Sequence, residues 1–94
     1  MAVLIDTPVW PWCGRLWSHL VSDVSYDELH AFVAAELGIP RRAFQGDHYD
    51  VPEELHAVAV AAGAESVGCR ELLARLRGAG LRKPHGRGAA AAPR

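Results

Sequence analysis

The segment between Ser25 and Gly38 carries a complete set of helix signals and constrains the fold more than any other part of the sequence. Ser25 and Glu28 form a capping box, in which the serine hydroxyl accepts from the third helical amide and the glutamate reaches back to the cap amide. Leu29 and the apolar residues that follow at intervals of three and four define one buried face. Gly38 is a left-handed stop, and Pro40 prevents continuation. The pattern predicts an amphipathic helix that must pack against another element.

Short apolar runs alternate with further amphipathic stretches along the chain. Residues 2–5 are typical of a strand buried on both faces, and residues 16–21 fit either a strand or a helical stripe, of which the strand is favoured. Residues 7–14 contain two prolines and are expected to form a loop. Helical patterns recur over 52–63 and 68–78. The alternation predicts a small α/β domain with a mostly parallel sheet and about three helices.

Length and charge place this domain in residues 1–82 and a flexible basic tail in residues 83–94. A chain of 94 residues, half of them hydrophobic, is one globular domain. All eleven acidic residues lie in residues 1–74, whereas residues 75–94 carry six of the ten lysines and arginines. Such a tail could bind nucleic acid or an acidic partner; the alternative is a solvated helix face followed by a frayed end.

The sequence predicts a cytoplasmic protein with no membrane association. The longest apolar run, residues 57–62, is too short to cross a bilayer, and the N-terminus lacks the pattern of a signal peptide. Cys13 and Cys69 are expected to be free thiols, since nothing in their spacing indicates a disulfide or a zinc ribbon.

The segment from Gly46 to Pro52 concentrates the chemically active side chains. His48 and Asp50 are two residues apart, so in an extended segment they point to one side, with Asp47 and Tyr49 on the other. A carboxylate beside an imidazole suits a general base, and the same pair suits a metal ligand set. The alternative is a local network that pins a loop, in which Asp47 caps a turn and His48 bonds the backbone.

Polar residues follow the predicted strands at their ends. Asp6 ends the first strand and Asp23 follows the second. Because ligands bind beyond the carboxyl ends of parallel strands, we expect His19, His48 and Asp50 to converge within roughly 10 Å. Asp6, His19 and Asp23 would then form a mixed ligand set for a divalent metal ion. The alternative is a partly buried His19 bonded to a backbone carbonyl and a turn role for Asp23.

Basic and aromatic residues add candidates for substrate binding. Arg41 and Arg42 at a short helix start, with Arg15, could hold an anion, although solvated arginines are the alternative. Trp10 and Trp12 could stack on a base or sugar, or could pin their loop onto the core.

Five motifs, in order, resemble a known family. V-L-I-D-T-P, G-R-L-W-S-H-L-V-S-D, D-E-L-H, R-R-A-F-Q-G-D-H-Y-D-V-P and A-V-A-A-G-A span roughly residues 1–82. Together they resemble the small bacterial and phage proteins of domain of unknown function 4031. The resemblance carries no activity, but it implies a site. The family's characteristic polar positions correspond to Asp6, Arg15, His19, Asp23, His30, Arg42, Gln45, His48, Tyr49 and Asp50.

The leading hypothesis is a hydrolase or transferase acting on a phosphate-bearing substrate, either a nucleotide or nucleic acid. The predicted catalytic residues are His48, Asp50, His19 and Tyr49; the predicted substrate-binding residues are Arg15, Arg41, Arg42 and Gln45; the predicted metal ligands are Asp6, His19 and Asp23. The main alternative is a non-catalytic adaptor for nucleic acid or protein, which would need an open basic face. A third hypothesis is a homo-oligomeric structural protein whose tryptophan loop forms an interface.

Overall fold

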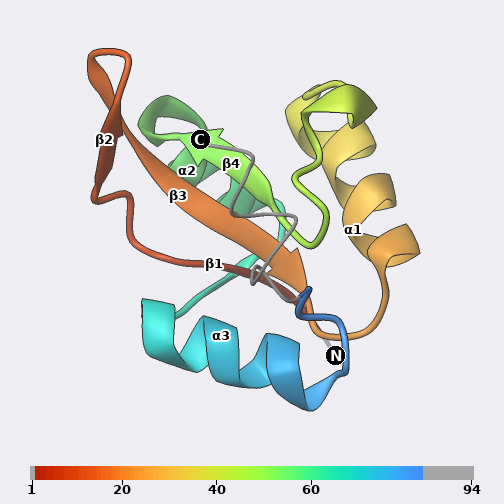
Figure 1. Ribbon diagram of the computed structural model, residues 1–94. Coiled ribbons are helices and arrows are strands. Elements are labelled where there is room, and N and C mark those ends of the chain that lie inside the picture. The colour runs from red at the N-terminus through yellow and green to blue at the C-terminus, as the bar shows by residue number, and fades with distance from the viewer. Residues whose placement is uncertain (1, 84–94) are drawn as a thin grey trace.

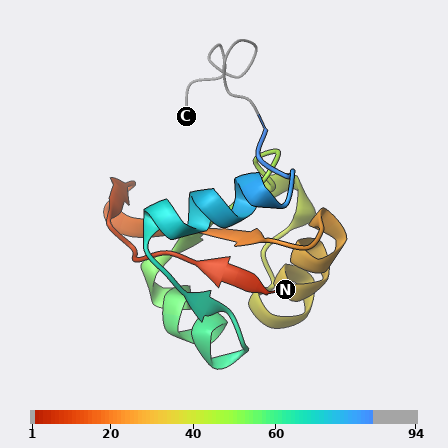
Figure 2. The same ribbon diagram turned by 90° about the horizontal axis from the view of Figure 1, so that it is seen from below.

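The computed structural model describes residues 2–83 and shows a small α/β domain in three layers (Figure 1). A five-stranded sheet has helix α3 on one face and helices α1 and α2 on the other, as the turned view shows (Figure 2). The α/β class and the three helices are therefore confirmed. The helices span Tyr26–Phe32 (α1), Glu53–Ala61 (α2) and Cys69–Gly78 (α3).

The sheet is mixed and mostly antiparallel, so the expectation of a mostly parallel sheet is wrong. The central strand β3 is antiparallel to β1, β2 and β4, and the one parallel pair among the described residues joins β1 to β5. Parallel pairing between β1 and β3 would need a crossover of a dozen or more residues, and the short link that joins these two strands holds no helix. The strands span Val3–Ile5 (β1), Trp10–Trp12 (β2), Arg15–Ser22 (β3), Tyr49–Pro52 (β4) and Glu65–Ser66 (β5).

A β-hairpin replaces most of the loop expected at residues 7–14. Strand β2 pairs with the start of β3. Cys13 and Gly14, both at positive φ (52° and 77°), form the two-residue turn between them, which is the backbone that tight hairpins require. Pro11 is accommodated because β2 lies at an edge of the sheet, where one side of the strand needs no backbone donor.

The first helix begins and ends as its sequence predicts, with one difference at the cap. The Glu28 amide donates to Ser25 Oγ at 3.0 Å, and the helix passes through a π-helical turn to Gly38, whose φ of 68° ends it. The Glu28 carboxylate, however, accepts from the hydroxyl of Ser22 and does not reach the cap amide. The backbone amide of Ser25, the cap residue, donates instead to Ser22 Oγ, at 3.1 Å.

Alternation along β3 divides the interior into two cores. Leu20 belongs to the larger core beneath α1 and α2, whereas Val21 packs with Leu72 and Leu76 of α3. On α2, Val58 is 43% exposed and Ala59 is the buried residue. His19, two residues before Val21, lies on the α3-side face of β3, where the Trp10 ring stacks on its imidazole.

The chain after α3 returns to the rest of the domain. The Tyr26 hydroxyl donates to the carbonyl of Leu81, and the Lys83 ammonium lies over the Tyr26 ring, 5.4 Å from its centroid. The predicted tail, apart from Lys83, lies outside the described residues. Within residues 2–83, none of the helices has the length and apolar character needed to cross a membrane.

Candidate functional site

The pairing of β3 with β4 assembles the candidate site. The register places His19 opposite Asp50, and Leu20 opposite Tyr49. Since side chains alternate, His19 and Asp50 share the face toward α3 while Leu20 and Tyr49 enter the larger core. His48, directly before β4, lies edge-on to His19 with 5.3 Å between ring centroids. One ligand atom from each of His19, His48 and Asp50 lies within 4.8 Å of the other two, so the predicted convergence is confirmed.

Each of the two histidines is anchored by a buried carboxylate. Nδ1 of His19 lies 2.9 Å from Asp6 Oδ2, and the other oxygen of Asp6 accepts from the His19 amide at 2.6 Å. Nδ1 of His48 lies 2.7 Å from Asp47 Oδ1. In both rings Nε2 is therefore the nitrogen left for chemistry, and the ring orientation is fixed. Carboxylate–histidine pairs of this kind orient imidazoles as metal ligands.

Two atoms at the centre of the site are close together but not hydrogen-bonded. Nε2 of His48 lies 3.2 Å from Asp50 Oδ1, yet the contact is not aligned as a hydrogen bond. Both atoms are buried and have no hydrogen-bond partner among the described residues. Buried polar atoms without partners are rare because each costs free energy. An ion pair without an aligned hydrogen bond can take either a proton or a third partner between its two atoms.

The Asp47 carboxylate accepts hydrogen bonds from three groups around the site. Besides the His48 ring it accepts from the Lys83 amide at 2.9 Å and from Arg82 Nη1 at 3.4 Å, and it is fully buried. Burial by itself would raise the pKa of this carboxyl, but the bonds from His48 and Lys83 outweigh it, and the pKa is lowered. Asp47 thus holds a negative charge that fixes both the imidazole and the chain after α3.

His48 has a raised pKa. Burial alone would lower the pKa of this imidazole, but Asp47 and then Asp50 stabilise the imidazolium more strongly. A metal ion that binds Nε2 would therefore have to displace a proton, and its affinity would rise with pH.

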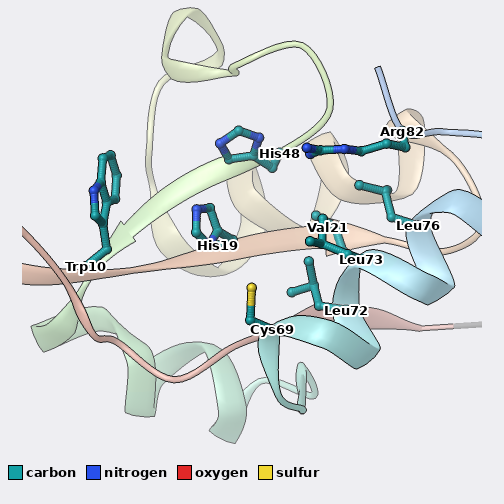
Figure 3. A pocket seen from close by; sticks show the side chains of 9 residues that line it. All are labelled: Trp10, His19, Val21, His48, Cys69, Leu72, Leu73, Leu76 and Arg82. Atoms are coloured by element: carbon teal, nitrogen blue, oxygen red, sulfur yellow. The ribbon is translucent and has the colours of Figure 1, made fainter. Parts of the chain in front are cut away.

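A pocket of about 240 Å³ adjoins the histidines (Figure 3). Trp10, His19 and His48 line it at one end, and apolar side chains of α3 such as Leu73 line it at the other. The guanidinium of Arg82 points toward His48, and the thiol of Cys69 points into the pocket. Sequence reasoning missed Arg82 as a site residue because it fell at the end of the expected domain; its place in a basic segment was the available signal.

Two predicted site residues are engaged elsewhere. Tyr49 is buried on the core face of β4, where burial raises its pKa and its hydroxyl lies 2.8 Å from His30 Nδ1. Asp23 binds Arg75 through two hydrogen bonds, at 2.8 and 3.1 Å, and accepts from the Ala2 amide at 2.6 Å. Neither lines the pocket. A catalytic role for Tyr49 and a metal-ligand role for Asp23 stay predictions without support from this placement.

The predicted anion-binding residues also lie outside the pocket lining. Arg15 forms an ion pair with Glu54 at 2.9 Å, at the hairpin end of the sheet. Arg41 and Arg42 are exposed on a short 3₁₀ turn. Gln45 is exposed as well. Its backbone amide donates to the His48 carbonyl at 2.8 Å and closes the turn before β4. Their roles in substrate binding stay predictions.

Comparison with known proteins identifies a family. A family model described as "Protein of unknown function (DUF4031)" matches residues 3–79, which confirms the resemblance seen in the motifs. Neither the curated proteins nor the solved structures contain a match to the chain.

Proposed function

Because the chain belongs to a family of unknown function, DUF4031, we propose its function from the geometry of the site: a hydrolase of phosphate esters that depends on one divalent metal ion. His19 and His48 would each supply Nε2, and Asp50 would supply a carboxylate oxygen. The observation that carries the proposal is the convergence of these three ligand atoms within 4.8 Å. Nε2 of His48 and Oδ1 of Asp50 also support it, because both are buried and have no aligned hydrogen bond among the described residues.

The ligand set suits particular metals and a particular use. Two imidazoles and a carboxylate bind zinc in catalytic sites, and the same set binds other divalent first-row metals with open positions. Such an ion lowers the pKa of a bound water to about 7 and thereby supplies a nucleophile at neutral pH. Asp6 and Asp47 would hold the two rings in place, each through its hydrogen bond to Nδ1.

A cationic side chain favours an anionic substrate. Arg82 lines the pocket with 29% of its side chain exposed, and its one hydrogen bond among the described residues is the long contact to Asp47. A guanidinium with donors to spare suits a phosphate group. In hydrolysis the oxygen of water would bond to phosphorus, the bond from phosphorus to the ester oxygen would break, and one water proton would end on the released alcohol.

The adaptor alternative has less support. It needs an open basic face, but two arginines of the domain form ion pairs with acidic neighbours. Arg15 pairs with Glu54, and Arg75 pairs with Asp23, Glu65 and Glu71.

Metal content and metal binding test the proposal directly. Protein purified without chelator or nickel resin should contain close to one equivalent of a divalent metal by elemental analysis, or take up one equivalent of Zn²⁺ by calorimetry. Asp50→Asn and His19→Ala should weaken Zn²⁺ binding by tenfold or more. His56→Ala on α2 is the control and should bind as the parent does. Equal binding by all these proteins would remove the metal site.

Activity forms the second arm of the test. Hydrolysis of 4-nitrophenyl phosphate should require the metal and should be lost in Asp50→Asn. Full activity in the presence of a chelator would contradict the proposal. It would instead indicate acid–base chemistry by His48 alone, for which the raised pKa of its imidazole is suited.

A further inference from the structure

We infer that the pocket takes a small phosphate monoester whose organic part is compact and apolar, and that it excludes nucleotides and nucleic acid. The inference rests on the proposed function, since the phosphate is the group that the metal site and Arg82 would hold. It goes further by naming the rest of the substrate from the walls of the pocket.

The size of the pocket sets the first limit. Its volume of about 240 Å³ lies below the ~300–1,000 Å³ typical of pockets for drug-sized ligands. A phosphate and a short aliphatic or single-ring group fill such a space. A mononucleotide would have to leave part of its sugar and base outside the pocket, and a polynucleotide would need an open groove with stacking platforms.

The walls set the second limit. Away from the histidines, Arg82 and Cys69, the lining is apolar: Trp10 lies at one side, and Val21, Leu72, Leu73 and Leu76 lie toward the other. The Trp10 ring runs nearly parallel to the His19 ring, at 15° with 5.9 Å between centroids, which keeps a flat wall next to the metal ligands. A sugar with several hydroxyls would lose its water there without gaining hydrogen bonds, whereas an apolar group gains from burial.

A free cysteine in the pocket lining can report whether the pocket is occupied. Cys69 lines it, and Cys13 lies in the β2–β3 turn, outside that lining; both thiols are exposed and free. A molecule that fills the pocket should therefore slow alkylation of Cys69 and leave that of Cys13 unchanged. The ratio of the two rates measures occupancy independently of any catalysis.

The experiment uses the full chain loaded with Zn²⁺ and three substrates that all release an alkoxide: benzyl phosphate, glycerol phosphate and adenosine monophosphate. We expect kcat/KM for benzyl phosphate to exceed that for the other two by at least tenfold. Phenylphosphonate, which cannot be hydrolysed, should protect Cys69 from N-ethylmaleimide at least threefold by mass spectrometry. Leu73→Gln, on the pocket wall, should reduce both effects. Ala74→Gln, the exposed neighbour on α3, is the matched control and should preserve them.

The outcomes separate this inference from the proposed function. Metal-dependent cleavage of adenosine monophosphate or glycerol phosphate as fast as benzyl phosphate would overturn the inference and leave the hydrolase standing. Protection of Cys69 without hydrolysis of any ester would overturn the hydrolase and support the ligand class. Absence of protection by phenylphosphonate in protein that still binds Zn²⁺ would also overturn the inference.

Discussion

Asp47 and Asp50 flank the same imidazole, but their contacts with it differ, and a pair of isosteric substitutions can test whether their roles differ as well. Asp47 is fully buried and accepts from the His48 ring, from Arg82 and from the Lys83 amide. Asparagine at this position keeps one oxygen acceptor and turns an NH₂ group toward one of these donors. Asp50 Oδ1 makes no aligned hydrogen bond among the described residues, so Asp50→Asn removes none from it.

The magnitudes follow from these contacts. A hydrogen bond to a charged group contributes about 1.5–3 kcal/mol, and breaking a buried charge pair costs about 3–5 kcal/mol. Asp47→Asn loses at least one such bond and leaves a buried amide facing a donor, so we expect a loss of about 3–5 kcal/mol in the free energy of unfolding. Asp50→Asn removes the 3.2 Å ion pair with His48 but no aligned hydrogen bond, so the unfolding free energy of the metal-free protein should fall by no more than about 1 kcal/mol.

Urea unfolding of the metal-free proteins at pH 7 measures both changes, provided that the slope with denaturant stays constant. Asp27→Asn, on the exposed side of α1, controls for the loss of one negative charge. If Asp50→Asn destabilised the protein as much as Asp47→Asn, Asp50 would be a structural partner of His48. The main reason for treating it as a metal ligand would then be gone.

The shifted pKa values of His48 and Asp47 predict how the free energy of unfolding depends on pH. The pKa of His48 is raised above its ordinary 6.5, so its contribution is complete below pH 6.5 and is lost as pH rises through the folded value. The pKa of Asp47 is lowered below 3.8, so its contribution is complete above pH 3.8 and is lost as pH falls through the folded value. For metal-free protein the pair therefore stabilises most between these limits. In Asp47→Asn the free energy of unfolding should fall less as the pH rises above 6.5. An unchanged dependence of the unfolding free energy on pH would show that Asp47 does not raise the pKa of His48.

Two further substitutions test the packing of the first helix. Leu29→Ala removes a fully buried side chain from the larger core and should cost about 2–5 kcal/mol in urea unfolding; a cost below 1 kcal/mol would mean that α1 packs differently. Ser25→Ala removes the acceptor of the Glu28 amide and should cost about 1 kcal/mol in thermal unfolding; an unchanged melting temperature would mean that the cap contributes nothing.

The helices could be predicted from the sequence because their signals are local. The cap at Ser25, the spacing of apolar residues and the stop at Gly38 all lie within one segment, and the structure follows them. The direction of the strands could not be predicted in this way. It depends on how the chain returns after β1, and the two-residue turn at Cys13 and Gly14 was hidden in a stretch whose prolines indicated a loop.

The convergence of the candidate site residues was predicted from the sequence, but the structural reason for it is a different one. His19, His48 and Asp50 converge as expected, but they do so as neighbours across an antiparallel strand pair and not at a common rim of strand ends. Asp47 was expected to point away from His48. The chain bends at Gly46, where φ is 94°, so the alternation of an extended strand does not apply there and the carboxylate turns to the imidazole.

The contacts of Asp47 also determine how much chain a working domain requires. The family match ends at residue 79, whereas two donors to this buried carboxylate, the guanidinium of Arg82 and the amide of Lys83, come from beyond that boundary. A recombinant fragment trimmed to the matched region would retain the three proposed ligands, yet it would lose the donors that compensate the charge behind one of them. Fusion tags and expression boundaries should therefore be placed after Lys83, and measurements on shorter fragments would describe an altered site.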